Sequence, residues 1–167
     1  MDIELDLEKI KKLGELHENE NLKFRTFLKQ NSDKKVDRIV HGLNREVSAQ
    51  IDCTTCGNCC KKLKPSITRE DLDRLANRLS ITPQQIENDY TELDEGVLYF
   101  SHLPCSFLKD NKCTIYDDRP EDCRSFPHLH KEYFTSRLWG VIDNYSICPI
   151  VFNVFEALKI KFSWRRK

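Results

Sequence analysis

The stretch Cys53-Thr54-Thr55-Cys56-Gly57-Asn58-Cys59-Cys60 places four thiols within eight residues. Cysteines separated by two residues can direct two thiolates at one metal ion. Gly57 gives the backbone the freedom that a turn around a bound metal needs. The triplet Cys53, Cys56 and Cys59 has the C-x₂-C-x₂-C spacing of ferredoxin-type iron–sulfur loops. The stretch therefore predicts a metal-binding loop around which the rest of the chain is organised.

Cys60 is the odd member of this stretch. Adjacent Cα atoms lie about 3.8 Å apart, whereas disulfides prefer about 5.5–6 Å, so a Cys59–Cys60 disulfide would be strained. In an extended chain, neighbouring side chains also point to opposite sides. We therefore expect Cys59 and Cys60 to serve different sites, or one of the two not to be a ligand.

Eight cysteines form the candidate ligand set. Tetrahedral Zn²⁺ is satisfied by four thiolates, and so is a 4Fe–4S cluster. Eight thiols therefore fit two closed sites, or one site plus spare thiols, and ordinary buried cysteines are the remaining alternative. The candidate metal ligands are Cys53, Cys56, Cys59, Cys60, Cys105, Cys113, Cys123 and Cys148. For two sites, we expect Cys53, Cys56 and Cys59 to join Cys148, and Cys60 to join Cys105, Cys113 and Cys123.

The spacing of the cysteines also bears on the metal. The C-x₂-C-x₂-C triplet and the proline after Cys148 favour an iron–sulfur cluster, because a proline after a ligand cysteine is typical of ferredoxins. The wider spacing of the other cysteines is equally compatible with zinc. We expect a 4Fe–4S cluster first and Zn²⁺ second as the cofactor.

Other residues offer weaker signals for chemistry. His128 and His130 follow Cys123 and could supply a ligand or a hydrogen bond to a thiolate, although surface and packing roles are the simpler interpretation. The lysines of Lys61-Lys62-Leu63-Lys64 either offset thiolate charge or lie in solvent. The sequence contains no nucleotide-binding or hydrolase motif, so we predict no catalytic residue. The Cys53–Cys56 pair could act as a redox dithiol, but it lacks the βαβ context of thioredoxin-like proteins.

Composition restricts the class of protein. The chain has 167 residues, with 27 basic and 27 acidic side chains, so no net field attracts nucleic acid or an anionic membrane. No stretch approaches twenty apolar residues, and the N-terminal residues lack the apolar segment of a signal peptide. We expect a cytoplasmic protein without membrane contact. In a reducing cytosol, eight cysteines indicate metal ligands rather than a disulfide framework.

The hydrophobic pattern predicts a mainly α-helical fold with a small β-hairpin. A strand is expected at 96–100, and a hairpin around 109–112, whose loop of two or three residues decides whether Cys105 and Cys113 share a face. A short strand is expected within 133–142. Thr68 and Thr82 each begin a capping-box pattern at the start of a helix. Helices are expected at about 4–30, 33–49, 69–79, 83–90, 119–124 and 149–162, followed by a basic tail at 163–167.

We expect a single compact domain organised around the cysteine-rich site. Its parts are an N-terminal helical arm at 1–49, a cysteine-cluster metal-binding domain at 50–150, and a C-terminal helix and tail at 151–167 packed on that domain. The arm is interpreted as a packing hairpin, with binding of a protein partner as the alternative.

The same residues resemble a known family. The stretch Cys53–Cys60 is similar to the CxxCxxCC signature of the YkgJ-like cysteine-cluster family, described as zinc- or iron-chelating. The resemblance continues at Thr68–Leu72 and Cys105–Leu108, and it includes Cys148. It is sharpest at Cys113–Pro127, which resembles the family's CxIYxxRPxxCRxFP segment. It implies a small metal-binding protein without an assigned reaction. Arg119 and Arg124 match family positions too, and we expect them to hold the loop by pairing with nearby aspartates or backbone carbonyls.

We therefore expect a binding or carrier module for metal. The alternative is a redox enzyme, or a subunit of one, that uses an iron–sulfur cluster or a dithiol. No substrate pocket or nucleophile–base pair can be identified in the sequence, which favours the first class.

Overall fold

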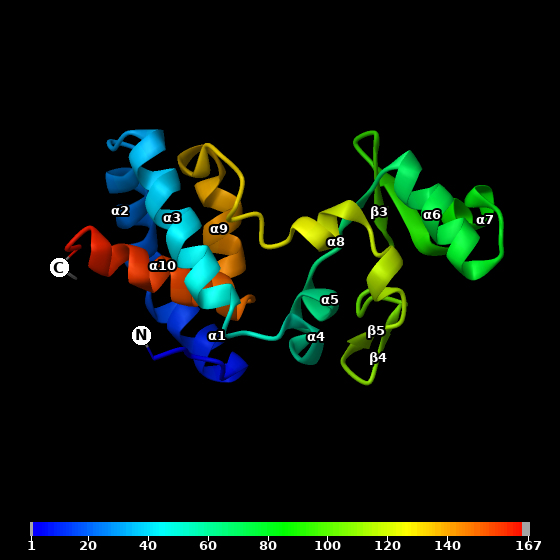
Figure 1. The fold of residues 1–167 in the computed structure, drawn as a ribbon, viewed down its shortest axis with the longest axis horizontal. Helices are drawn as coiled ribbons and strands as arrows, with labels where there is room; N and C mark the ends of the chain where they lie inside the picture. The colour runs from blue at the N-terminus through cyan, green and yellow to red at the C-terminus, as the bar shows by residue number, and fades with distance from the viewer. Residues whose placement is uncertain (1, 165–167) are drawn as a thin grey trace. The chain divides into compact units, whose positions relative to one another are not determined.

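The computed structural model describes residues 2–164. The chain folds into two compact units (Figure 1). The helical unit comprises the described residues of Met1–Asp52 and Pro127–Lys167, and the cysteine unit is Cys53–Phe126. The expectation of a mainly helical protein with a little β-structure is confirmed.

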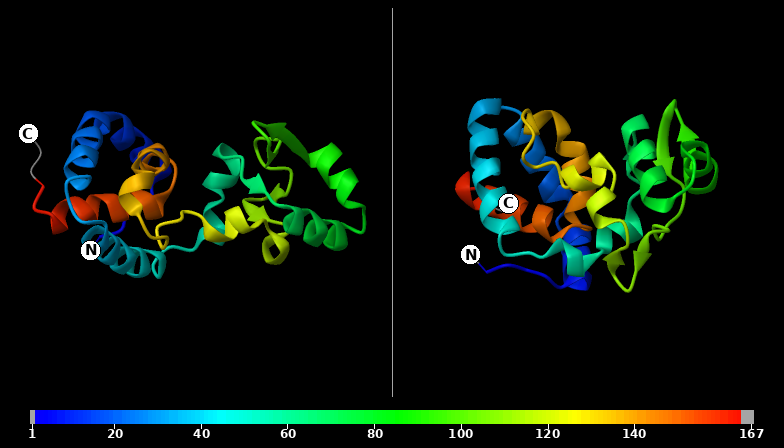
Figure 2. Two further views of the ribbon diagram at one scale, coloured as in Figure 1. Left: turned by 90° about the horizontal axis from the view of Figure 1, so that it is seen from above. Right: turned by 45° about the vertical axis from the view of Figure 1, so that its right-hand side comes forward.

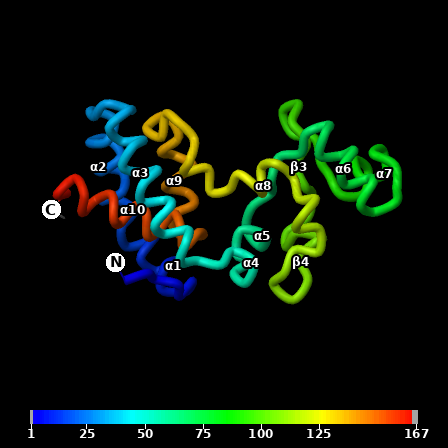
Figure 3. The backbone as a smooth tube through the Cα atoms, viewed as in Figure 1, coloured from blue at the N-terminus to red at the C-terminus, as the bar shows by residue number. Residues whose placement is uncertain are grey.

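The helical unit is built from both ends of the chain. The chain leaves the unit after α3 and returns to it before α9 (Figure 3). Its elements are α1 (Leu7–Leu16), α2 (Glu18–Leu28), α3 (Asp33–Ser48), the 3₁₀ helix η2 (Phe134–Arg137), α9 (Leu138–Tyr145) and α10 (Pro149–Lys161).

The helix expected at 4–30 is interrupted at His17. The backbone there has φ −95° and ψ 4°, so α1 ends and α2 begins on either side of it. The His17 ring is buried, and its Nδ1 lies 2.9 Å from the hydroxyl oxygen of Tyr145. That hydroxyl donates to Glu156 Oε1 at 2.7 Å, so the imidazole N–H is the donor to Tyr145. A contact between distant parts of the chain thus accompanies the break.

Helix α10 is the centre of the helical unit and lies among helices from both chain ends (Figure 2). The helix expected at 149–162 is confirmed. Almost every residue from Pro149 to Lys159 is buried, because the helix is apolar on most of its surface and needs partners all round. Phe24 of α2 meets Phe155 edge-on with ring centroids 5.4 Å apart. Helix α10 packs on α1, α3 and α9. Its expected packing on a metal-binding domain at 50–150 stays a prediction. The structure divides its two compact units after residues 52 and 126, and the expected domain division at residues 50 and 150 stays a prediction.

Two further differences concern the C-terminal third. The strand expected within 133–142 is wrong, since these residues form η2 and α9. Aromatic and β-branched residues suggested a strand, but the turn before η2 is held by buried Asp37 of α3, which accepts hydrogen bonds from the amides of Tyr133 and Phe134. Trp164 packs its ring 5.3 Å from that of Phe24. The rest of the expected basic tail, residues 165–167, lies outside the described residues.

The cysteine unit begins with α4 (Cys53–Cys56) and α5 (Asn58–Lys62). Then follow β1 (Ser66–Ile67), α6 (Arg69–Leu79), α7 (Pro83–Tyr90), β2 (Thr91–Asp94) and β3 (Val97–Phe100). The last part holds β4 (Leu108–Lys109), β5 (Lys112–Cys113), the 3₁₀ helix η1 (Tyr116–Asp118) and α8 (Glu121–Ser125). Both expected capping boxes are confirmed, at Thr68 with Asp71 and at Thr82 with Gln85.

Two antiparallel sheets complete this unit. The larger has the strand order β1-β3-β2, with Ser66 opposite Tyr99 and Thr91 opposite Phe100. The hydrophobic pattern predicted β3 but not β2, whose Thr-Glu-Leu-Asp residues are mostly exposed and polar at a sheet edge. Nor did it predict β1, which has only two residues. The small core of this unit is Ile67, Leu72, Leu75, Ala76, Ile86, Phe100, Phe107 and Ile115. Over residues 2–164, no helix combines the length and the apolar character needed to cross a membrane.

Candidate metal centre

The stretch that carries four of the cysteines forms two short helices joined at Gly57. Gly57 has φ +60° and ψ 8°, which is the left-handed region that glycine adopts without a steric penalty. A Cβ atom here would lie 3.0 Å from the carbonyl oxygen of Asn111 and 3.3 Å from Leu108 Cδ1. The expectation that Gly57 permits a turn inside the cysteine stretch is confirmed. The turn also brings this backbone against the β4–β5 hairpin.

Cys59 and Cys60 do not point to opposite sides. Both lie in α5, and their sulfur atoms are 4.0 Å apart. Our expectation assumed extended chain, but successive side chains in a helix are separated by about 100°. The geometric reason for assigning the two thiols to different sites is therefore wrong, and the assignment itself stays a prediction.

A backbone hydrogen bond attaches the segment that contains Cys105 to the stretch Cys53–Cys60. The amide of Cys105 donates to the carbonyl of Cys60 at 2.8 Å, and the carbonyl of Cys105 accepts from the amide of Leu108 at 2.9 Å. The chain then enters β4 and turns back through Asp110 and Asn111, which have φ 49° and 61°. These values are those of a two-residue type I′ hairpin loop.

The hairpin register answers a question that the sequence left open. Leu108 pairs with Cys113 and Lys109 with Lys112, so the loop has two residues. In a long strand this register would place Cys105 and Cys113 on opposite faces. However, β4 begins at Leu108, and Cys105 lies in the turn before it. The rule about strand faces therefore does not apply to Cys105.

Four thiols share one electrostatic neighbourhood. Burial raises the pKa of Cys105 and of Cys113, and it raises the pKa of Cys123 to about 12. In all three cases a negative charge on nearby Cys60 raises the pKa further. The pKa of Cys60 itself is lowered to about 7, chiefly by a hydrogen bond from Cys59. The charges of the four thiols thus repel one another and affect one another's pKa. A bound cation would offset this repulsion, because metals bind cysteine as the thiolate.

Two basic side chains act on the same thiols. Lys61 helps to lower the pKa of Cys60, and Arg119 opposes the rise in the pKa of Cys113. Lys64 instead forms an ion pair with Glu92 at 2.8 Å, and Lys62 is exposed. Of the lysines after the cysteine stretch, Lys61 therefore fits the role of offsetting thiolate charge.

The remaining candidates differ in their surroundings. Cys53 is exposed, whereas Cys56 and Cys59 are half-buried. Cys148 belongs to the helical unit, where it is buried at the N-terminus of α10 and its amide donates to the carbonyl of Asn144 at 2.9 Å. His128 and His130 also belong to the helical unit. The roles predicted for Cys148, His128 and His130 stay predictions.

Cys60, Cys105, Cys113 and Cys123 interact electrostatically, but the described part of the chain holds no assembled coordination shell. Within residues 2–164, no three His, Cys, Asp or Glu side chains are arranged so that they could hold a metal ion. The donor set nevertheless fits a metal, because soft thiolates are the ligands that zinc and iron–sulfur clusters share.

Comparison with known proteins agrees with this donor set. A family model with the description "CxxCxxCC: Putative zinc- or iron-chelating domain" matches residues 52–140, more than half of the chain. The chain belongs to this CxxCxxCC family. The match includes every candidate cysteine except Cys148, which lies beyond its end. Searches of curated proteins and of solved structures found no match.

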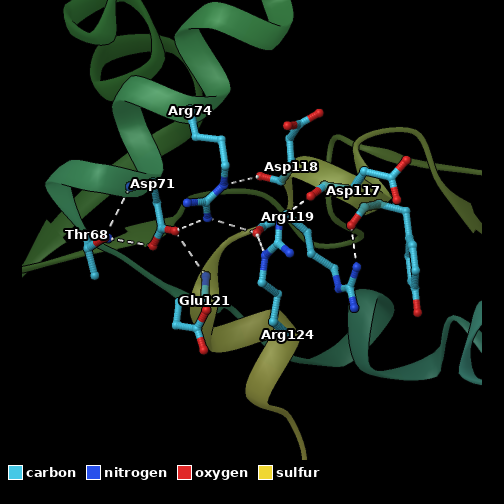
Figure 4. Close-up of polar contacts among 9 residues, drawn as sticks. Thr68, Asp71, Arg74, Asp117, Asp118, Arg119, Glu121 and Arg124 are labelled. Carbon is cyan, nitrogen blue, oxygen red and sulfur yellow. Dashed lines mark hydrogen bonds and ion pairs between the residues drawn. The ribbon is translucent and has the colours of Figure 1, made fainter.

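Two arginines of the CxxCxxCC domain brace the segment between Cys113 and Cys123 (Figure 4). The Arg124 guanidinium donates to the carbonyl of Arg119 at 3.0 Å and also to that of Asp117. The Arg119 guanidinium donates to the carbonyl of Tyr116 and lies 3.7 Å from the centre of its ring. The expectation that these arginines hold the loop through backbone carbonyls is confirmed.

A second set of contacts on this segment of the CxxCxxCC domain was not predicted from the sequence. Asp71 and Arg74, both on α6, bond to its backbone (Figure 4). Asp122 accepts a hydrogen bond from the amide of Ser66 at 2.9 Å, which ties α8 to β1. Asp71 was recognisable as part of a capping box, but no local pattern indicates that it also contacts residue 121, fifty positions away.

Proposed function

We propose that this chain binds zinc or iron through thiolates of the cysteine unit, as a binding or carrier module. Membership of the CxxCxxCC family supports zinc or iron chelation. The observation that carries the residue assignment is the shared electrostatic neighbourhood of Cys60, Cys105, Cys113 and Cys123. We infer that these four thiols form one site. Cys53, Cys56 and Cys59, on the adjacent α4 and α5, are proposed as ligands of a second site.

The chemistry of four thiolates suits two cofactors. Zn²⁺ bound by four thiolates is structural, because all four of its positions are occupied and it has no redox chemistry. A 4Fe–4S cluster takes the same number of thiolates and carries one electron at a time. The C-x₂-C-x₂-C triplet keeps the iron–sulfur cluster our first choice and zinc our second. In either case the cytoplasm, where thiols stay reduced, is the compartment we propose.

The test is metal analysis of protein purified without oxygen. Broad visible absorption with iron and acid-labile sulfide indicates a cluster, whereas a colourless protein with stoichiometric zinc indicates a zinc site. The variants Cys105→Ser and Cys123→Ser should lose the same equivalent of metal, because they belong to one proposed site. Cys56→Ser is the matched control and should retain that equivalent. A folded protein with neither metal would refute the proposal, and loss of different equivalents in Cys105→Ser and Cys123→Ser would refute the grouping.

A redox role is the second candidate, and one observation favours it. The sulfur atoms of Cys59 and Cys60 are 4.0 Å apart, and the pKa of Cys60 is lowered to about 7, so a large fraction of this thiol is thiolate at neutral pH. Thiolates, and not thiols, are the reactive form of cysteine. A reversible reduction potential in the physiological range, lost in Cys60→Ser, would support this role. A redox-silent protein with bound zinc would exclude the cluster version of it.

A further inference from the structure

Asp71 on α6 is a buried carboxylate with three hydrogen-bond donors. Its side chain is about 1% exposed. Oδ2 accepts from the amide of Thr68 at 3.0 Å, and Oδ1 accepts from the amide of Glu121 at 3.0 Å and from the Arg74 guanidinium. A buried carboxylate needs such partners, since an unpaired one is costly. Both carboxylate oxygens are therefore occupied by two backbone amides and a guanidinium and are not open to a ligand (Figure 4).

The three contacts let one carboxylate cap two helices. With Thr68 it completes the capping box at the start of α6. With Glu121 it caps α8, whose own N-cap residue is Pro120 and makes no side-chain cap hydrogen bond. Amides in the first turn of a helix need acceptors from outside it, and a negative charge there is also favourable. Asp71 thus supplies to α8 what the local sequence lacks.

Arg74 forms further hydrogen bonds to the backbone of the segment between Cys113 and Cys123. Its guanidinium donates to the carbonyl of Asp118 at 3.3 Å and to that of Arg119 at 3.1 Å. Between Tyr116 and Glu121, Pro120 is the buried residue and the others are exposed or half-buried. Apolar burial therefore contributes little to fixing these residues, and the polar contacts determine their position. The segment lies between Cys113 and Cys123, and Cys123 comes two residues after Glu121.

We propose that Asp71 and Arg74 are positioning residues of the metal site, which fix η1 and the start of α8 and so hold the Cys123 thiol where it can act as a ligand. This inference rests on the proposed function. Groups that orient ligands affect affinity, and losing one typically weakens metal binding about 10–100-fold. The role differs from general support of the fold, because its effect is confined to Cys123, whereas Cys105 is attached separately through the carbonyl of Cys60.

The test compares two substitutions with matched controls on the same helix. Asp71→Asn keeps the size of the side chain but replaces one acceptor oxygen by an amide donor. Its control is Asp73→Asn, at an exposed position. Arg74→Gln removes the bonds to the carbonyls of 118 and 119. Its control is Arg69→Gln, where the arginine is exposed and pairs with Glu87 at 2.8 Å.

Two readouts are taken on the full-length protein loaded with Zn²⁺. Competition with a chelator gives the zinc affinity, and mass spectrometry gives the alkylation rate of each cysteine. We expect zinc binding to weaken about 10-fold or more in Asp71→Asn and Arg74→Gln. We expect alkylation of Cys123 to accelerate by at least that factor relative to Cys105, and both controls to match the wild type. If Asp71→Asn does not fold by circular dichroism, Arg74→Gln decides, because it leaves both caps of Asp71 in place.

The outcomes separate this inference from the proposed function. Wild-type protein that binds neither zinc nor iron overturns both. Zinc binding by the wild type, with unchanged affinity and unchanged protection of Cys123 in Arg74→Gln, overturns the positioning role alone. Equal acceleration at Cys105 and Cys123 also overturns it, because it shows general loosening of the unit.

Discussion

Replacing Gly57 by alanine should destabilise the cysteine unit, and the structure allows the size of the effect to be worked out. Gly57 has φ +60°, and an L-residue in this region costs about 1–2 kcal/mol. Alanine regains about 0.4–1 kcal/mol by restricting the unfolded chain. The added Cβ also meets the carbonyl oxygen of Asn111 at 3.0 Å, a backbone atom that moves only with the hairpin. The two backbone effects alone leave a net loss of up to about 1.6 kcal/mol. The close contact with Asn111 adds to it, so we expect a net loss of about 1–2 kcal/mol.

The assay must report on the two units separately. Both tryptophans, Trp139 and Trp164, lie in the helical unit, so their fluorescence during denaturation follows that unit and should not change. Hydrogen exchange in peptides from 66–126 follows the cysteine unit. A loss of 1–2 kcal/mol corresponds to about a 5–30-fold decrease in protection.

Two further variants divide the loss between its causes. Gly96 also has a positive φ, of 83°, but a Cβ there would meet nothing within 4 Å. Gly96→Ala therefore measures the backbone penalty without the contact. Gly57→Asn keeps the contact but has a smaller backbone penalty, because asparagine visits this region more readily. Unchanged protection of 66–126 in Gly57→Ala would refute the reasoning, and equal losses in Gly57→Ala and Gly96→Ala would show that the contact with Asn111 is unimportant.

Two other predictions follow from the same structure. Removal of metal under reducing conditions should accelerate hydrogen exchange over residues 53–126 and leave α1–α3 and α10 protected. The reason is that the cysteine unit has the smaller apolar core, and structural zinc can contribute about 10–16 kcal/mol to folding. Unchanged protection around 105–123 after verified metal removal would contradict this prediction. The second prediction concerns Glu156, where burial alone would raise the pKa, but hydrogen bonds from Lys159 and Tyr145 outweigh it and lower the pKa below its usual 4.5. A carboxylate with a lowered folded-state pKa stabilises at neutral pH, and this contribution is lost as pH falls below about 4.5. Glu156→Gln should therefore lower the free energy of unfolding by about 1.5–3 kcal/mol at pH 7, as for hydrogen bonds to charged groups. It should also reduce the loss of stability on acidification, and tryptophan fluorescence measures both effects. An unchanged dependence of stability on pH would contradict the role assigned to Glu156.

The sequence alone determined the features that depend on neighbouring residues. The capping boxes at Thr68 and Thr82 were predicted because each of these hydroxyls binds an amide three residues away. Helix α3 and helix α10 were predicted because apolar residues recur at helical spacing or fill nearly the whole surface. The turn at Gly57 was predicted because glycine between closely spaced cysteines needs no partner elsewhere to adopt a positive φ.

Tertiary structure decided the features that depend on distant residues. The break at His17 is accompanied by a hydrogen bond to Tyr145, and the turn before α9 is held by Asp37, neither of which is near in sequence. The candidate site shows the same division. Cysteine spacing identified the thiols, but the approach of Cys60 to Cys105 and the capping of α8 by Asp71 arise only when separate segments meet. The physical reason is that spacing reveals which donors the chain carries, whereas their positions are set by backbone hydrogen bonds and buried carboxylates contributed by elements far away along the chain.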